Sequence, residues 1–209
     1  MDKKIQFWDR VAAKYAKRKI TNEEAYQKKL DQTQAYLTPE TKMLELACGT
    51  GTTALHLAPY VEHIKAVDLS LNMLEIAKEK ARKSGIENIT FSCCDIEAET
   101  LPEQSYDVIL AHSILHLLQE REPVLQKIYK ALKPGGVFIS STACLGKGFW
   151  WLKMIIVPGA FFGLLPSIRF FTDTELKEQF CQTGFEIIED WQPSKAQALF
   201  MIARKPTRS

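Results

Sequence analysis

The sequence predicts an α/β protein with a Rossmann-like, mostly parallel sheet, and two features of the chain support this. Between residues 41 and 142, short apolar stretches alternate with segments of helical periodicity. Strands separated by helical crossovers of this length pair in parallel, with helices on both faces of the sheet. The chain ends differently, in FEIIEDW and ALFMIARK joined by a Pro-Ser turn. Such a short link makes a hairpin, so the last strand is expected to run antiparallel.

Two amphipathic helices are predicted ahead of the first strand. Apolar residues recur at helical spacing from Phe7 to Tyr15, and a capping-box pattern at Thr21 begins a second helix that runs to about Leu37. Strands are predicted at residues 42–47, 64–69, 88–93, 106–112 and 136–142, with helices at 52–58, 71–83 and about 122–132. A helix capped at Thr172 precedes the final hairpin. The expected architecture is a mostly parallel sheet of seven strands, strand 7 antiparallel, with N-terminal capping helices.

Length and composition indicate one soluble domain. Of the 209 residues, 46% are hydrophobic and 25% charged, which is ordinary for a globular protein. The net charge of +2 gives no reason to expect a nucleic-acid or anionic-membrane partner. Five irregularly spaced cysteines without a CxxC pair favour a reduced, cytoplasmic protein without a zinc or other metal site. The charged, amphipathic N-terminus is not expected to be a secretory signal.

The domain is expected to divide into four parts, each with its own role. Residues 1–40 form an N-terminal helical cap and residues 41–145 the α/β core. Residues 146–172 are an apolar insert, and residues 173–209 form the C-terminal helix and hairpin.

A glycine-bearing turn, Cys48 to Gly51, follows the first strand and indicates a ligand that approaches the backbone. No Lys-Ser or Lys-Thr pair follows, which excludes a triphosphate-binding loop. Residues 49–54 do satisfy G-x-G-x-x-A, and Asp68 lies near the position of a ribose-binding acid, as in a dinucleotide site. However, Glu45 would repel a diphosphate at the strand end. A cationic ligand without phosphate fits this acid better.

S-adenosylmethionine has those properties. Its carboxylate would meet the amide groups at the helix start after Gly51, where the helix dipole favours negative charge. Its ammonium group would face Glu45, and Asp68 would accept both ribose hydroxyls. Asp95, at the end of the third strand, would accept from the adenine amino group, although a simple turn acid is the alternative there.

At these residues the sequence resembles the class I S-adenosylmethionine-dependent methyltransferases. The resemblance rests on ELACGTG at 45–51, VDLS at 67–70, Asp95-Ile96, YDVI at 106–109 and LKPGG at 132–136. It covers residues 42–142 closely and the C-terminal part more loosely, and small bacterial enzymes of the quinone-biosynthesis type are the most similar subgroup. The resemblance implies the strand order 3-2-1-4-5-7-6, with residues 41–145 as the cofactor-binding core and residues 146–172 as an insert at the acceptor site. One departure is Ala47, where the family usually has its first glycine.

The resemblance implies a cofactor site of fourteen residues, with Met73 in the position of a hydrophobe packed on adenine. This residue, like Cys48, could instead serve the core alone. The implied cofactor-binding residues are Tyr15, Glu45, Leu46, Ala47, Cys48, Gly49, Thr50, Gly51, Asp68, Leu69, Met73, Asp95, Ile96 and Ala111.

Two histidines near the end of the fourth strand are candidates for a general base. Ligands in such sheets bind beyond the carboxyl ends of the strands, where His112 and His116 are expected. We take His116 as the first candidate and His112 as the second, with a surface role as the alternative for both. His56 and His63 are expected to be structural.

The apolar segment from Phe149 to Phe171 is interrupted by Lys153, Pro158 and Arg169, and a spanning helix between two strands of a sheet is implausible. It is interpreted as an acceptor pocket and lid, with sheet-edge cover as the alternative. Transient contact with a membrane surface is a minor option.

Together these features predict methyl transfer from S-adenosylmethionine to a small apolar or aromatic acceptor, with S-adenosylhomocysteine as product. The alternatives are an NAD(P)-dependent oxidoreductase and a non-catalytic S-adenosylmethionine-binding module. The protein is expected to act as a monomer or homodimer on a small-molecule acceptor, without nucleic acid.

Overall fold

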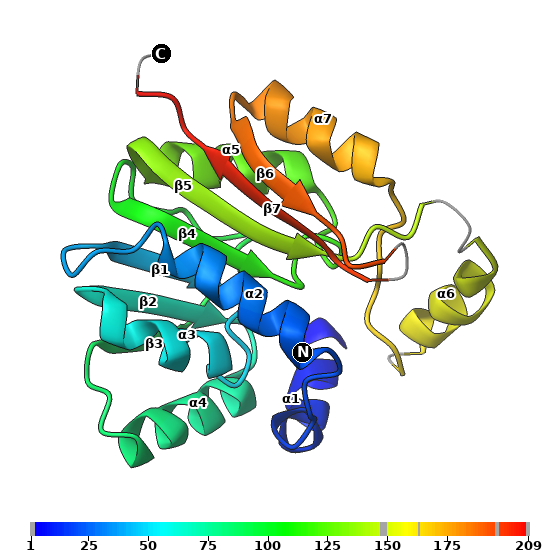
Figure 1. Cartoon of the computed structure of the whole chain (residues 1–209). Helices are drawn as coiled ribbons and strands as arrows, with labels where there is room; N and C mark the ends of the chain where they lie inside the picture. Colours follow the sequence, from blue (N-terminus) through cyan, green and yellow to red (C-terminus); the bar gives the residue numbers. More distant parts are fainter. Residues whose placement is uncertain (1–2, 147–149, 163, 195–196, 208–209) are drawn as a thin grey trace.

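A computed structural model describes residues 3–146, 150–162, 164–194 and 197–207, which contain a seven-stranded sheet (Figure 1). Its strand order, β3-β2-β1-β4-β5-β7-β6, is the predicted one. β7 runs antiparallel to both β5 and β6, and the other pairings are parallel, as predicted. The strands are β1 (Lys42–Leu46), β2 (His63–Asp68), β3 (Ile89–Cys93), β4 (Tyr106–His112), β5 (Leu132–Thr142), β6 (Glu186–Trp191) and β7 (Leu199–Arg204).

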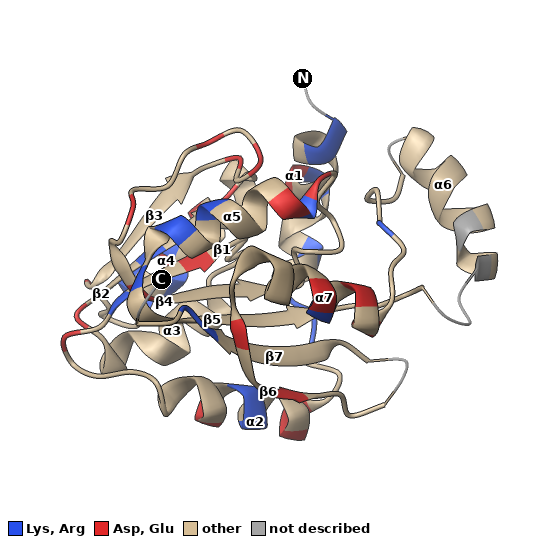
Figure 2. Ribbon diagram, turned by 90° about the horizontal axis from the view of Figure 1, so that it is seen from above, with Lys and Arg blue, Asp and Glu red and all other residues tan. Residues whose placement is uncertain are grey.

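Helices cover both faces of the sheet and extend beyond the ends of the parallel strands. In Figures 1 and 2, α6 stands away from the sheet, beyond the carboxyl ends of the strands. The helices are α1 (Lys3–Ala16), α2 (Glu23–Gln34), α3 (Thr52–Leu57), α4 (Leu71–Lys83), α5 (Arg121–Ala131), α6 (Lys153–Phe161) and α7 (Asp173–Thr183), with short 3-10 turns at Ala58–Tyr60 and Trp150–Leu152.

Alternation along each strand divides the core into one cluster on each face of the sheet. Leu44 and Phe138 belong to the cluster beneath α5 and α7, where Phe138 stacks on Phe180 with ring centroids 5.2 Å apart. Met43 and Phe200 point to the opposite face, beneath α2 and α3. Because both faces of the central strands are buried, these strands are apolar almost throughout.

The predicted boundaries of α2 and β5 differ from the structure for identifiable reasons, and several others differ by one residue. Asn22, not Thr21, caps α2, because its side chain accepts a hydrogen bond from the Ala25 N–H at 3.0 Å, and the helix ends at Gln34. β5 begins at Leu132 because that residue already pairs with Tyr106; a register shift then absorbs the predicted turn at 132–136. The capping box at Thr172 is present as predicted.

Candidate cofactor and acceptor site

The turn after β1 places three residues in the left-handed region, and the two glycines serve different purposes. Ala47, Gly49 and Gly51 have φ angles of +53°, +55° and +75°. A Cβ atom on Gly51 would lie 2.8 Å from the Cβ of Ala77 on α4, so this glycine is required by helix packing. A Cβ on Gly49 would meet only Tyr15 of α1, at 3.7 Å. Gly49 is therefore the glycine with open space in front of it.

Ala47 is the strained position of this turn. A left-handed conformation costs a residue with a side chain about 1 kcal/mol relative to glycine. The expected misfit at Ala47 thus lies in the backbone as well as in the methyl group.

Glu45 is a buried acid with one unpartnered oxygen. Its side chain is 2% exposed, and its Oε2 atom has no hydrogen-bond partner. Burial, reinforced by repulsion from Asp68, raises the pKa of the Glu45 carboxyl to about 8, although a hydrogen bond from the Ala54 backbone opposes the shift. A carboxylate in this position is short of one cationic or hydrogen-bond-donating partner. An ammonium group fits that requirement, and a diphosphate does not.

Asp68 ties the end of β2 to the glycine turn. Its Oδ2 accepts from the Gly49 N–H at 2.8 Å and its Oδ1 from the Ser70 N–H at 2.9 Å. Burial raises the pKa of this carboxyl, and the two backbone hydrogen bonds oppose the rise. Each oxygen retains a second lone pair, so the carboxylate can still accept two ligand hydroxyls.

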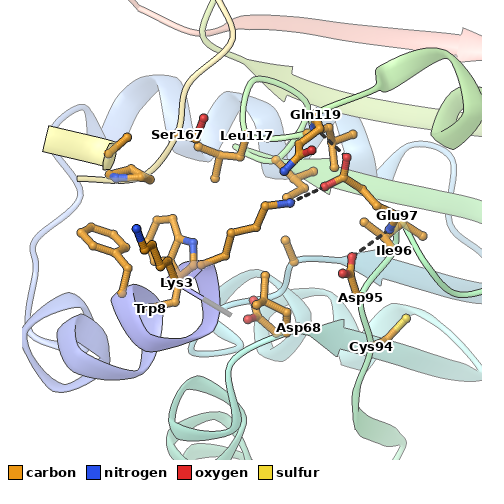
Figure 3. Close-up of a pocket in the computed structure, with 18 of the residues that line it drawn as sticks. Lys3, Trp8, Asp68, Cys94, Asp95, Ile96, Glu97, Leu117, Gln119 and Ser167 are labelled. Carbon is orange, nitrogen blue, oxygen red and sulfur yellow. Dashed lines mark hydrogen bonds and ion pairs between the residues drawn. The ribbon is translucent and has the colours of Figure 1, made fainter. Parts of the chain in front are cut away.

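A first cavity of about 250 Å³ lies at the ends of β2, β3 and β4 (Figure 3). Asp68 and Asp95 line it from neighbouring strand ends, and Leu69 and Ile96 supply apolar walls. Trp8 of α1 lies across the cavity from these acids in Figure 3. Two acids beside flat apolar walls suit a polar sugar joined to an aromatic base.

A second cavity of about 710 Å³ lies at the ends of β1, β4 and β5 and shares Ala47 with the first. Glu45 and Gly49 line one part of it, and His112, Lys29 and Ser141 line another. The Lys29 Nζ donates to Ser141 Oγ at 2.8 Å, and burial lowers the pKa of this lysine. Ala47 thus forms the wall at which the two cavities meet.

α1 covers the first cavity and is held there by hydrogen bonds of Asp9 and an ion pair of Lys4. Asp9 Oδ1 accepts from Ser70 Oγ at 2.6 Å and from the Asn72 N–H at 3.2 Å. Lys4 Nζ lies 2.7 Å from Glu97 Oε2, an ion pair drawn across the cavity in Figure 3. Spacing in the sequence predicts a helix here but not these contacts, because no local pattern distinguishes an acid that binds a distant loop from one that faces solvent.

Ten of the fourteen expected cofactor residues line the cavities. Asp68, Leu69, Asp95 and Ile96 line the first, Tyr15, Glu45, Cys48, Gly49 and Thr50 the second, and Ala47 both. Four do not. Leu46, Gly51, Met73 and Ala111 are buried in the core and line neither cavity. Trp8, Lys29 and Ser141 line a cavity without having been predicted.

The structure places the two histidine candidates differently with respect to the cavities. His112 ends β4 and lines the second cavity, and its buried Nε2 has no partner. His116 lies in the following turn and lines neither cavity, because that turn directs its side chain into a buried environment where Nδ1 is unpartnered. Burial lowers the pKa of His112 to about 3 and that of His116 to about 4, so both rings are neutral at pH 7.

The strand order and the two adjoining cavities at the carboxyl ends of the strands fit the class I S-adenosylmethionine-dependent methyltransferases. The sequence also matches the family described as "Methyltransferase domain" over residues 37–204. The chain therefore belongs to this family, which confirms the class that the motifs predicted; S-adenosylmethionine is the cofactor of that class.

The curated relatives that this chain matches align with about half of it. It is 36% identical over 107 residues to a malonyl-[acyl-carrier protein] O-methyltransferase of Bacillus cereus, with 50% of this chain and 38% of that protein covered. It is 33% identical over 115 residues to a wheat (Triticum aestivum) phosphoethanolamine N-methyltransferase, with 54% and 22% covered. The chain thus spans less than half the length of either relative.

Solved structures confirm the fold over a greater length. The complex of DhpI with S-adenosylhomocysteine superposes with a TM-score of 0.76 at 20% identity and covers 99% of this chain and 97% of that one. YcgJ of Bacillus subtilis gives 0.71 at 17% identity, with 86% and 99% covered. At these identities the likeness concerns the fold alone.

Proposed function

We propose that this protein transfers the methyl group of S-adenosylmethionine to a small acceptor bound in the second cavity. The observation that carries the proposal is Glu45, whose buried Oε2 lacks a partner at the edge of a glycine turn. A diphosphate would add negative charge beside this acid, and the oxidoreductase alternative is therefore disfavoured. When bound, the cofactor supplies a methyl group already activated by a sulfonium charge.

The residues have separate roles in this proposal. Glu45 holds the ammonium group, Asp68 holds the ribose hydroxyls, and Asp95 holds the adenine amino group. Gly49 leaves room for the bound molecule, and Ala47 lies where the cofactor passes from one cavity to the other. The N-terminal helix, fastened through Asp9 and Lys4, excludes water from the first cavity.

The acceptor is proposed to have an apolar or aromatic body and a polar group. Tyr26 and Ile20 supply apolar surface to the second cavity, whereas Lys29, Ser141 and His112 supply polar groups. His112 is neutral and its Nε2 is unpartnered, so this nitrogen can accept a hydrogen bond from an acceptor hydroxyl or amine. The chain's main task is alignment of the acceptor with the methyl carbon.

Calorimetric titration with S-adenosylhomocysteine tests the cofactor assignment. Asp68→Asn is expected to weaken binding about 100-fold, because two hydrogen bonds to a charged group are lost at about 1.5 kcal/mol each. The control is Asp31→Asn, which changes an exposed acid on α2 and should leave affinity unchanged. Equal affinity of both variants would contradict the ribose role.

The acceptor is then sought with labelled S-adenosylmethionine and a panel of phenols, amines, thiols and quinones. Transfer to one class that is lost in Asp68→Asn supports the proposal. Cofactor binding with no transfer to any class would favour the non-catalytic binding module instead.

A further inference from the structure

The segment between β5 and α7 exposes an unusually large apolar surface. Eight of the thirteen exposed large hydrophobic side chains in the described part of the chain lie within residues 151–165, which we call the apolar platform. Met154, Phe161 and Phe162 are each more than 70% exposed. A helix that is apolar all round normally lies in a protein core or in lipid, yet α6 is in neither here. An exposed patch of this kind indicates an interaction site.

The small net charge of the chain hides a strong asymmetry around this platform. Residues 1–20 and 144–172 together contain ten Lys or Arg and two Asp or Glu, a net charge of +8. The remaining residues contain seventeen Lys or Arg and twenty-three Asp or Glu, a net charge of −6. No Asp or Glu occurs between Cys144 and Thr172. In Figure 2, the ribbon of α6 accordingly shows no acidic residue.

The basic N-terminal helix and the platform lie side by side. Lys3 Nζ donates to the Phe161 backbone oxygen at 3.1 Å and lies 5.4 Å from the centroid of the Phe161 ring. Ala160 and Leu165 of the platform line the first cavity together with Lys3 and Lys4. Basic charge, exposed apolar side chains and one rim of the cofactor cavity therefore occupy the same end of the molecule.

We propose that the apolar platform docks on the surface of an anionic phospholipid bilayer, with the neighbouring basic side chains Lys3 and Arg169 facing the lipid headgroups. None of the described helices is long and apolar enough to cross a membrane, and α6 has only nine residues. A spanning helix needs about 20 residues, so the platform inserts at the headgroup level. The net charge of +2 does not reveal this surface, because it averages over parts of the chain with opposite net charge.

Vesicle cosedimentation of the full chain tests the proposal without any acceptor. Vesicles of equimolar phosphatidylglycerol and phosphatidylcholine should retain the protein, and pure phosphatidylcholine should retain little. Salt at about 0.5 M should weaken the binding, because it screens attraction to the headgroups. The double variant Phe161→Ser with Phe162→Ser should bind at least about tenfold more weakly.

Matched variants separate the platform from the rest of the surface. Ile155→Ser on α6 should weaken vesicle binding, whereas Ile188→Ser on β6, also exposed, should not. Arg169→Gln should lower affinity about fivefold, the effect of one basic charge near the surface, and Lys130→Gln on α5 should have no effect.

Three results would overturn the proposal. The first is equal binding of the Ile155→Ser and Ile188→Ser variants to anionic vesicles. The second is a concentration-dependent dimer, seen by sedimentation velocity, that the platform substitutions abolish; the platform would then bind a second copy. The third is hydrogen-exchange protection of α6 by S-adenosylhomocysteine without vesicle binding, which would make it a lid. S-adenosylhomocysteine affinity should be the same in every platform variant, so this test is independent of the proposed enzymatic function.

Discussion

The cofactor end of the sheet and the apolar platform are built in opposite ways. At the strand ends, Glu45 and Asp68 are acids buried at 2% and 8% exposure, held by backbone hydrogen bonds. In the platform, apolar side chains are exposed and the sequence is without acids from Cys144 to Thr172. Apolar side chains are usually buried and charged ones exposed, and each region departs from this distribution. Both departures indicate a partner, a cationic small molecule in the first case and a lipid surface in the second.

The largest expected effect concerns the two histidines, which test whether the acceptor meets the chain at the second cavity. His112→Gln should lower kcat by about 100-fold or more if the acceptor loses a proton during transfer. His116→Gln is the control and should retain activity, because His116 lines neither cavity. Steady-state kinetics on the acceptor found in the panel would measure both. A larger loss of kcat in His116→Gln would instead assign the general-base role to His116, the first candidate from the sequence.

Glu45→Gln tests whether the fold holds Glu45 in its neutral form before the cofactor binds. The folded pKa is about 8 and the ordinary value 4.5, so deprotonation of Glu45 in the unfolded chain removes stability as the pH rises from about 4.5 to 8. Glutamine cannot titrate. The variant should therefore gain about 3 kcal/mol in unfolding free energy at pH 7 and much less at pH 5.

Urea unfolding at the two pH values measures this difference. Glu189→Gln, on β6 away from both cavities, is the control and should show no such dependence. A stability change of Glu45→Gln that is equal at pH 5 and pH 7 would contradict a raised pKa.

Ala47→Gly has the smallest expected effect and tests the strain in the turn. Glycine adopts the φ angle of +53° without steric cost, so the variant should gain up to about 1 kcal/mol, or about 2–4 °C in Tm. Ala81→Gly in α4 makes the same chemical change at a helical position and should lose about 1 kcal/mol. A loss in both variants would show that the methyl group of Ala47 contributes more by packing than it costs in strain.

Most of the fold was predictable because its elements are local. The number of strands and their mostly parallel pairing follow from the alternation of apolar and helical segments, and the antiparallel β7 follows from a short connection. The strand order itself was predicted from the family resemblance. Asp68 and Glu45 were predictable for the same reason, since each ends a strand whose position the pattern gives. The contacts of Asp9, Lys4 and Lys29 were not, because they join segments 61, 93 and 112 residues apart.

Met73 and Gly51 illustrate a second limit. Both match motif positions, but the structure buries Met73 in the core and gives Gly51 a packing role against Ala77. A sequence motif shows that a residue type is required at a position, but it does not show whether the ligand or a neighbouring side chain requires it. In the platform, the sequence identifies an apolar segment, which we interpreted as an acceptor pocket. The sequence does not show which of its side chains are exposed, because exposure depends on how the rest of the chain packs against the segment. Residues 147–149 and 163 of that segment, Phe149 among them, lie outside the described residues.

Calorimetric titration of S-adenosylhomocysteine into the wild-type protein and Glu45→Gln, at pH 7 in two buffers of different ionisation enthalpy, tests the central claim most directly. Glu45 is protonated before binding, and an ammonium group beside it lowers its pKa again. The wild-type protein should therefore bind with release of about one proton. Glu45→Gln should bind more weakly and release none, and NADH should bind neither protein. Preferential binding of NADH, or wild-type binding of S-adenosylhomocysteine without proton release, would contradict the assignment of Glu45 to the cofactor's ammonium group.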